Sequence, residues 1–259
     1  YKIIKGDSDE DTEYFKSDFT SDEERESYEA ELCAQVEAEG AALLKNDNAA
    51  LPLASGAKVS LFGHGSVDLM YGGTGSGSVD TSKAPSFKQA LESQGITVNE
   101  TLWNLYSSDD MMKNYSRVTP AAISDTLEAN TQYAVNEAPW SKLSGAESSF
   151  AEYGDAAIVV LSRSGGEGAD LPSGENGTND SWVSGQEGDG NYLALSAEQK
   201  ELLANLKTLK DNGTFKKIVV LINSSNAIEL DFLNPELCGE DYGIDSAMWI
   251  GDVGQTGIN

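Results

Sequence analysis

Residues 156–172 read AAIVVLSRSGGEGADLP and join a hydrophobic segment to a glycine-rich loop. The consecutive apolar residues at 158–161 are typical of a strand covered on both faces, as in a parallel sheet. The loop therefore leaves the carboxyl end of that strand, where open α/β sheets bind their ligands. Glu167 stands between Gly166 and Gly168, and glycines let the backbone bend freely and let a substrate come close. This setting favours Glu167 as a presented acid, and the alternative interpretation is a solvated acidic turn.

Strands and helices alternate along the rest of the chain. Hydrophobic runs predict further strands at 59–62, 96–98, 217–223 and 247–250. Apolar residues at helical spacing predict helices at 21–44, 87–94, 102–106, 120–134 and 196–212. This alternation predicts an α/β fold with a doubly wound, mostly parallel sheet flanked by helices. Because a further helix should begin after Gly251 and the sequence ends at Asn259, we expect this fold to be incomplete at its C-terminal end.

Local signals mark the ends of several helices. Ser21 precedes Glu24, and Ser196 precedes Gln199, at the spacing of a capping box. Gly95 is placed to end the helix that precedes the strand at 96–98. The segments from 59 to 98 therefore predict a βαβ unit.

Length and charge limit the kinds of protein that this chain can be. Its 259 residues suffice for one large domain, and we expect an acidic lead-in arm at 1–20 followed by one α/β domain at 21–259. The chain has 43 acidic residues against 17 Lys and Arg, for a formal charge of −26. This charge repels phosphate, and it disfavours binding to nucleic acid or to an anionic membrane surface. No apolar run reaches the about 18 residues of a transmembrane helix.

Two glycine-rich segments invite a nucleotide interpretation. Gly63-His64-Gly65 follows a strand, as a dinucleotide fingerprint would, but Asp68 occupies the third glycine position and would repel a pyrophosphate. The segment at 72–77 lacks the Lys of a P-loop and is interpreted as a flexible turn. His64 is the one His of the sequence, which argues against a zinc site with several His or Cys ligands. We therefore expect neither a cofactor nor a metal.

Three segments in this order resemble the α/β-sandwich domain of family 3 glycoside hydrolases, usually called the C-terminal domain of that family. They are EGAALLKNDNAALPL at 39–53, YGGTGSGSV at 71–79 and SRSGGEGAD at 162–170. The helix start LSAEQKELL, the strand KIVVLIN and the pair Gly254-Gln255 support the match, which covers about residues 25–259.

The resemblance implies a site shared between two domains. In that family a TIM barrel, which is not in this chain, supplies the nucleophilic Asp and most contacts to the sugar, and the sandwich lends the acid/base Glu. Glu167 falls on that Glu, and we expect Arg163, Ser164 and Asp170 of the same motif to bind substrate. The motif carries one additional Gly, and Ala169 replaces a commoner aromatic residue, which leaves the acid in place and weakens any statement about the leaving-group subsite.

The implied activity is that of a retaining, exo-acting β-glucosidase, with oligosaccharides or aryl β-glycosides as substrates. A β-xylosidase of the same family, a non-catalytic α/β ligand-binding module and a nucleotide-binding domain are the alternatives. Because a native lead-in precedes the sandwich, the chain resembles the circularly permuted members, in which the barrel follows. The expected partner is the remainder of the same enzyme. Membrane contact would come only from an N-terminal anchor. The location stays unknown, with the bacterial cytoplasm and an anchored place at the cell surface as the two alternatives.

Overall fold

A six-stranded sheet forms the centre of the structure, a computed structural model that describes residues 17–119, 133–167, 171 and 192–254. The strands are β1 (Ala42–Asn46), β2 (Lys58–Phe62), β3 (Thr97–Val98), β4 (Ala156–Ser162), β5 (Ile218–Asn223) and β6 (Ser246–Trp249). The α-helices are α2 (Asp22–Gly40), α3 (Phe87–Ser93), α4 (Glu100–Tyr106), α5 (Asp109–Asn114), α7 (Ala197–Asp211) and α8 (Pro235–Cys238). Short 3-10 helices are η2 (Asp47–Ala49), η3 (His64–Ser66), η4 (Gly75–Gly77), η5 (Trp140–Leu143), η6 (Glu147–Ser149) and η8 (Asp231–Leu233).

The sheet is mixed and mostly parallel, in the order β1-β6-β5-β4-β2-β3. The strands from β6 to β3 pair in parallel, and β1 alone among these strands pairs antiparallel, with β6. The predicted α/β class with a mostly parallel sheet is therefore confirmed. The predicted βαβ unit is also present, since β2 and β3 pair in parallel and α3 lies between them in the chain.

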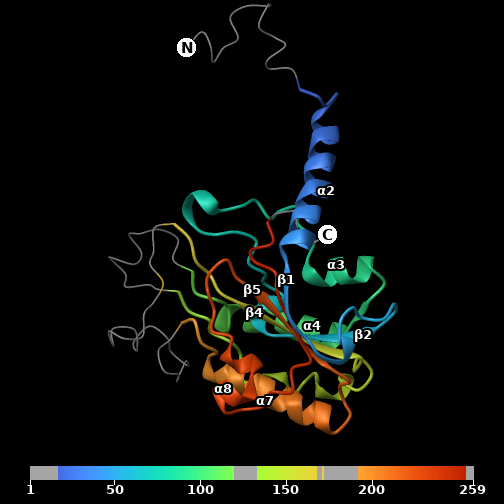
Figure 1. The fold of residues 1–259 in the computed structure, drawn as a ribbon, viewed down its shortest axis with the longest axis vertical. Coiled ribbons are helices and arrows are strands. Elements are labelled where there is room, and N and C mark those ends of the chain that lie inside the picture. The colour runs from blue at the N-terminus through green and yellow to red at the C-terminus, as the bar shows by residue number, and fades with distance from the viewer. Residues whose placement is uncertain (1–16, 120–132, 168–170, 172–191, 255–259) are drawn as a thin grey trace, which may run out of the picture.

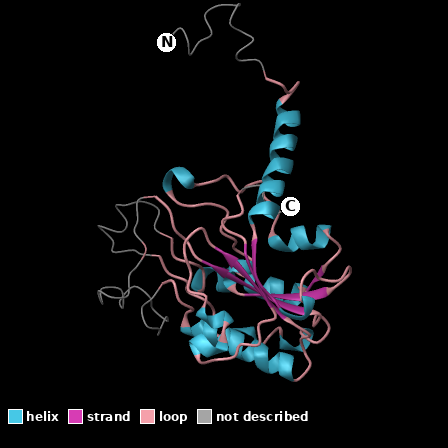
Figure 2. Ribbon diagram, viewed as in Figure 1, coloured by secondary structure: helices cyan, strands magenta, loops and turns pink. Residues whose placement is uncertain are grey.

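Helices cover the sheet from two sides (Figures 1 and 2). All seven residues of β4 are buried, as expected for a strand with both faces covered. Leu102 of α4 and Leu203 of α7 share one core cluster with Val159 of β4. Phe87 of α3 belongs to a second cluster, together with Val160 of the same strand. Alternate residues of β4 thus enter the two cores, and its carboxyl end is rigidly placed between them.

The capping signals act at helix starts as the sequence predicts. Ser196 and Gln199 form a complete capping box on α7. Ser21 accepts a hydrogen bond from the Glu24 N–H at 3.2 Å, while the Glu24 carboxylate turns to Thr20 instead of closing a box. Local sequence therefore determined where both helices begin.

The predicted helix at 21–44 was wrong at its C-terminal end. The helix ends at Gly40, and the next residues form β1, with Leu43 opposite Met248 of β6. Two adjacent leucines fit either period, and pairing with β6 satisfies the backbone of this segment at the edge of the sheet. The helix α2 itself projects from the rest of the protein (Figure 1), and none of its described residues is buried.

Several predictions lie wholly or mostly outside the described residues. They concern the arm at 1–20, the helix at 120–134 and the helix expected after Gly251. At the described end of the second segment, Ala134 forms an antiparallel bridge with Val118 and is not helical. None of the helices in the described ranges has the length and apolar character needed to cross a membrane.

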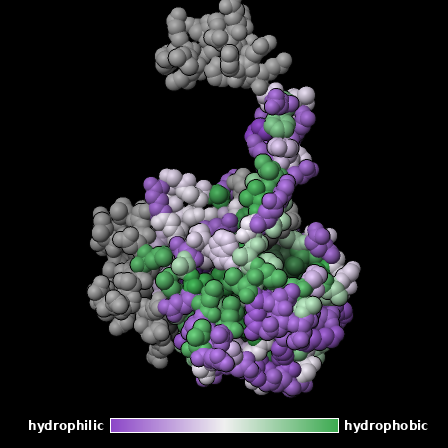
Figure 3. Space-filling view, viewed as in Figure 1, coloured by the Kyte–Doolittle hydropathy of each residue, from purple (hydrophilic) through white to green (hydrophobic). Residues whose placement is uncertain are grey.

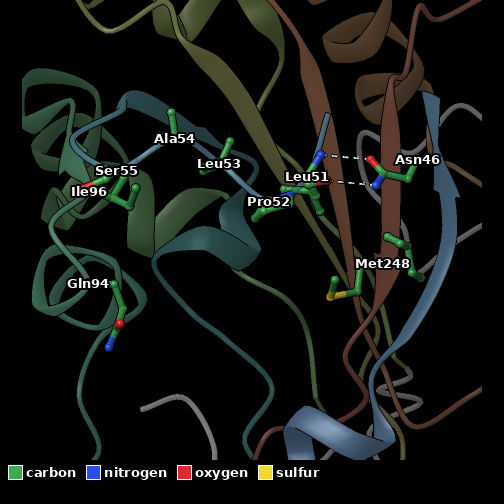
Figure 4. Close-up of a pocket in the computed structure, with 10 residues that line it drawn as sticks. Asn46, Leu51, Pro52, Leu53, Ala54, Ser55, Gln94, Ile96 and Met248 are labelled. Atoms are coloured by element: carbon green, nitrogen blue, oxygen red, sulfur yellow. Dashed lines mark hydrogen bonds between the residues drawn. The ribbon is translucent and has the colours of Figure 1, made fainter. Parts of the chain in front are cut away.

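Apolar side chains gather over the sheet on the face shown in Figure 3. Leu43 and Met248 line a cavity of about 650 Å³, and Figure 4 shows this cavity together with the segment at 51–55 that precedes β2. Asn46 holds this segment, because its side-chain amide donates to the Leu51 carbonyl and accepts from the Leu51 N–H, each at 2.9 Å. The cavity lies next to the amino ends of β2 and β3, so it is separate from the edge where β4 ends.

Candidate functional site

The carboxyl ends of the parallel strands meet at one edge of the sheet, and Asn223 at the end of β5 connects them. Its Oδ1 accepts hydrogen bonds from the Met70 N–H at 2.6 Å and from the Ser162 hydroxyl at 3.0 Å. Its Nδ2 donates to the Met70 carbonyl at 3.0 Å and to the Gly251 carbonyl at 2.7 Å. One buried amide thus joins the segments that follow β2 and β6 to the end of β4, and all four of its contacts stay shielded from water.

Glu167 follows β4 and lies against the glycine-rich segment that follows β2. The Glu167 Oε2 atom accepts a hydrogen bond from the Ser76 N–H at 2.8 Å and a second from the Ser76 hydroxyl at 2.5 Å. The Thr74 hydroxyl donates to the backbone carbonyl of Glu167 at 2.9 Å. Residues 74–76, which we call the Ser76 turn, therefore hold both the side chain and the main chain of Glu167.

Glycines make this close approach of two loops possible. A Cβ atom on Gly75 would lie 2.7 Å from Glu167 Oε2, and Gly75 has a φ of +64°. A Cβ atom on Gly166 would lie 2.2 Å from the Thr74 N, where Thr74 and Gly166 form a parallel bridge. A side chain at either position would push the loops apart. The segment at 72–77 is therefore part of the Glu167 site, and interpreting it as no more than a turn missed this role.

The Glu167 carboxylate is exposed to solvent. Hydrogen bonds from the Ser76 hydroxyl and the Ser76 N–H favour its ionised form and lower its pKa below the usual value for Glu. In the described residues the carboxylate is thus a fixed, ionised and accessible group. Such a group can accept a proton, and it becomes a proton donor where its surroundings raise its pKa.

Arg163, expected to bind substrate, is completely buried. Its guanidinium donates to the carbonyls of Tyr192 at 2.8 Å and Ala194 at 2.6 Å, and to the side chain of Gln199 at 3.0 Å. Burial lowers the pKa of Arg163 to about 10. These contacts fasten the segment before α7 to the end of β4, so a substrate-binding role for Arg163 stays a prediction.

Ser164 and Asp170 complete the expected substrate-binding set. Ser164 is buried, and its hydroxyl lies 2.8 Å from the Thr119 hydroxyl, while its carbonyl accepts a hydrogen bond from the Tyr192 hydroxyl at 2.9 Å. Asp170 lies outside the described residues. The structure thus brings Glu167 to the surface and turns Ser164 inward.

The first glycine-rich segment packs tightly against β4. A Cβ atom on Gly65 would lie 2.3 Å from the Ser162 Oγ, which explains the small residue there. Asp68 lies 3.1 Å from the ring nitrogen Nε2 of His64 and 3.0 Å from the guanidinium of Arg117. Asp68, the carboxylate that argues against a bound pyrophosphate, thus forms an ion pair with Arg117 of the same chain. Within the described ranges, no cluster of three or more His, Cys, Asp or Glu could hold a metal ion.

Sequence reasoning missed Ser76, Thr74 and Asn223 as members of the site. The polar Asn223 at the end of an otherwise apolar strand was the available signal for one of them. The Ser76 turn lies beside Glu167 because β2 pairs with β4, and loops that leave neighbouring parallel strands lie side by side. That pairing is not visible in the sequence.

Comparisons with known proteins agree on one family. The model of the glycosyl hydrolase family 3 C-terminal domain matches residues 41–258. A β-glucosidase of Ruminococcus albus is 29% identical over 228 residues, which are 88% of this chain and 20% of that protein. β-Glucosidase A of Butyrivibrio fibrisolvens is 28% identical over 203 residues, 75% of this chain and 21% of that protein. The chain therefore spans about a fifth of the length of these curated relatives.

Solved structures show the same fold. A β-glucosidase from Paenibacillus barengoltzii has a TM-score of 0.62 at 24% identity, over 88% of this chain and 22% of that one. β-Glucosidase 3B from Thermotoga neapolitana, in complex with glucose, has a TM-score of 0.62 at 24% identity, over 91% of this chain and 28% of that one. The resemblance noted in the sequence and the α/β-sandwich class are thereby confirmed.

Proposed function

Because this chain belongs to the family of glycosyl hydrolase family 3 C-terminal domains, we propose that it supplies the acid/base of a retaining, exo-acting β-glucosidase. The relatives that it matches are β-glucosidases, which supports a glycosidase-type hydrolase. We assign the acid/base to Glu167 and the nucleophile to a carboxylate on another domain of the same enzyme. The observation that carries this assignment is the exposed Glu167 carboxylate, held by Ser76 beyond the carboxyl end of β4.

Retaining hydrolysis divides the work between two carboxyl groups about 5–5.5 Å apart. In the first step the nucleophile attacks the anomeric carbon while protonated Glu167 gives its proton to the departing oxygen. In the second step the Glu167 carboxylate takes a proton from water, and that water displaces the nucleophile from the sugar. Glu167 ends protonated, so it is ready for the next cycle.

The second domain has an electrostatic task as well as a chemical one. With its described neighbours alone, Glu167 has a lowered pKa and stays ionised, which is the form that the second step requires. A domain that covers the carboxylate removes water from it and brings a like charge close, and both effects raise the pKa of a carboxyl group. The acid of the first step would thus be prepared by docking of the nucleophile domain.

The remaining predicted residues are given separate tasks in this proposal. Asp170, three positions after Glu167, is proposed to contact substrate. Arg163 and Ser164 are buried, and we propose that they support the loop from within. A direct substrate contact by Arg163 would require its guanidinium to leave the carbonyls that it now binds.

The test is Glu167→Gln in the complete enzyme, with two kinds of substrate. Cellobiose-like substrates have poor leaving groups that need a proton, so their hydrolysis should fall by about 10²- to 10⁴-fold. Nitrophenyl glycosides need little protonation, so their first step should persist and turnover should stall at the glycosyl-enzyme. Added azide attacks that intermediate without a base, and it should restore turnover and release a β-glycosyl azide.

Glu147→Gln is the matched control, because Glu147 is an exposed carboxylate that precedes the amino end of β4. It should hydrolyse both kinds of substrate like the unmodified enzyme. Near-normal hydrolysis of cellobiose-like substrates by Glu167→Gln would rule out Glu167 as the acid/base. It would favour a non-catalytic ligand-binding role for this loop.

A further inference from the structure

We propose that Ser76 is a positioning residue for Glu167, which it holds in the orientation from which the carboxylate meets substrate. This inference rests on the proposed acid/base role of Glu167. Ser76 precedes Glu167 by 91 positions, and yet both its N–H and its hydroxyl donate to the same carboxylate oxygen. No substrate contact is assigned to Ser76, and it acts through Glu167.

The Ser76 turn forms hydrogen bonds with Glu167 at two points, the main chain and the side chain, and this distinguishes the interaction from a chance surface contact. Thr74 binds the main-chain carbonyl of Glu167 at 2.9 Å, while Ser76 binds the carboxylate. Gly75 lies between them and leaves no room for a Cβ atom beside the Glu167 side chain. The turn thus fixes the backbone and the side chain of one residue together. A carboxylate held in this way loses less freedom when a substrate binds.

Hydrogen bonds to a carboxylate also set its acid strength. The Ser76 donors favour the ionised form, so they make Glu167 a stronger acid and a weaker base than it would be without them. In the first step such an acid releases its proton to the leaving oxygen more readily. The Ser76 turn is therefore expected to favour protonation of the leaving group in the first step over activation of water in the second step.

Few other titratable groups face Glu167 from the described elements packed against it. The segment at 72–77 carries none. The loop at 163–166 carries Arg163, whose guanidinium is buried and donates to backbone carbonyls. The Tyr133 hydroxyl lies 3.3 Å from the Thr74 hydroxyl, so it contacts the Ser76 turn at Thr74, while Ser76 binds the carboxylate. Ser76 is thus the described residue whose removal should change the titration of Glu167 most directly.

The test is the pH dependence of kcat/KM for the complete enzyme and its Ser76→Ala variant, with a cellobiose-like substrate. Glu167 must be protonated in the first step, so the alkaline limb of the profile reports its pKa. Loss of the hydroxyl raises that pKa, and the alkaline limb should move to higher pH by about half a unit to one unit. Both enzymes share the same nucleophile domain, so its influence cancels in the comparison.

Two further variants show whether the hydroxyl itself is responsible. Ser76→Thr keeps a hydroxyl and should return the alkaline limb toward its original position. Ser78→Ala removes an exposed hydroxyl from the same loop. Among the described residues the Ser78 side chain forms no hydrogen bond with Glu167, so this variant should leave the limb in place. An unmoved limb in Ser76→Ala, or the same shift in Ser78→Ala, would overturn the inference.

These outcomes separate the inference from the proposed function. If Glu167→Gln loses hydrolysis of cellobiose-like substrates while Ser76→Ala has the original profile, the acid/base role stands and the positioning role fails. If Glu167→Gln keeps this hydrolysis, the proposed function fails, whatever Ser76→Ala does.

Discussion

The backbone N–H of Ser76 donates a hydrogen bond to the carboxylate of Glu167 at 2.8 Å, although the two residues lie 91 positions apart in the chain. Ser76 belongs to the segment that follows β2, and Glu167 belongs to the loop that follows β4. The two strands are parallel neighbours in the sheet, so both loops leave from the same edge. The site therefore depends on the order of the strands as much as on the residues of either loop.

A methyl group at Gly75 should displace Glu167 without unfolding the protein. In Gly75→Ala the new Cβ would meet the Glu167 carboxylate, and a φ of +64° is unfavourable for Ala by about 1 kcal/mol. We expect kcat/KM for cellobiose-like substrates to fall by about tenfold or more while the melting temperature changes little. Gly77→Ala is the control, because nothing lies within 4 Å of a Cβ at Gly77. Equal activity of the two variants would count against close packing as the reason for Gly75.

Replacing Arg163 should destabilise the protein instead of weakening substrate binding alone. Arg163→Met leaves the carbonyls of Tyr192 and Ala194 buried without their donor, at a cost of about 3–5 kcal/mol. The melting temperature of the enzyme should therefore drop by several degrees. Arg25→Met, on the exposed helix α2, should leave the melting temperature nearly unchanged. A raised KM with an unchanged melting temperature would instead support the predicted substrate contact of Arg163.

The contacts of Asp68 with Arg117 and His64 should make stability depend on pH. Burial raises the pKa of Asp68, but the hydrogen bond from His64 and the charge of Arg117 outweigh it, so the folded pKa lies below the ordinary value. Asp68 thus stabilises the fold above its unfolded pKa of about 3.9, and this contribution is lost as pH falls through the lower folded pKa. Asp68→Asn should lower the melting temperature at pH 7, and the difference should shrink below about pH 4. A difference that stays constant down to pH 3 would contradict this assignment.

Much of the fold could be predicted because its signals are local. The run of apolar residues at 158–161 predicts a strand with two covered faces, and all of β4 is buried. Ser196 and Gln199 cap the helix that they were expected to cap. The end of α2 could not be predicted in this way, because Leu43 and Leu44 fit a helix or a strand until β6 lies beside them.

The sequence by itself determined the α/β class, the family and the position of Glu167 just beyond a buried strand. These conclusions need only periodicity, capping residues and motifs, which are properties of short segments. Only the tertiary structure decided that Ser76 binds Glu167 and that Arg163 is buried against Tyr192 and Ala194. Both relationships join residues that are distant in the chain. Ser76 meets Glu167 because β2 and β4 are parallel neighbours whose loops leave one edge of the sheet, and Arg163 is buried because the segment before α7 returns to the end of β4.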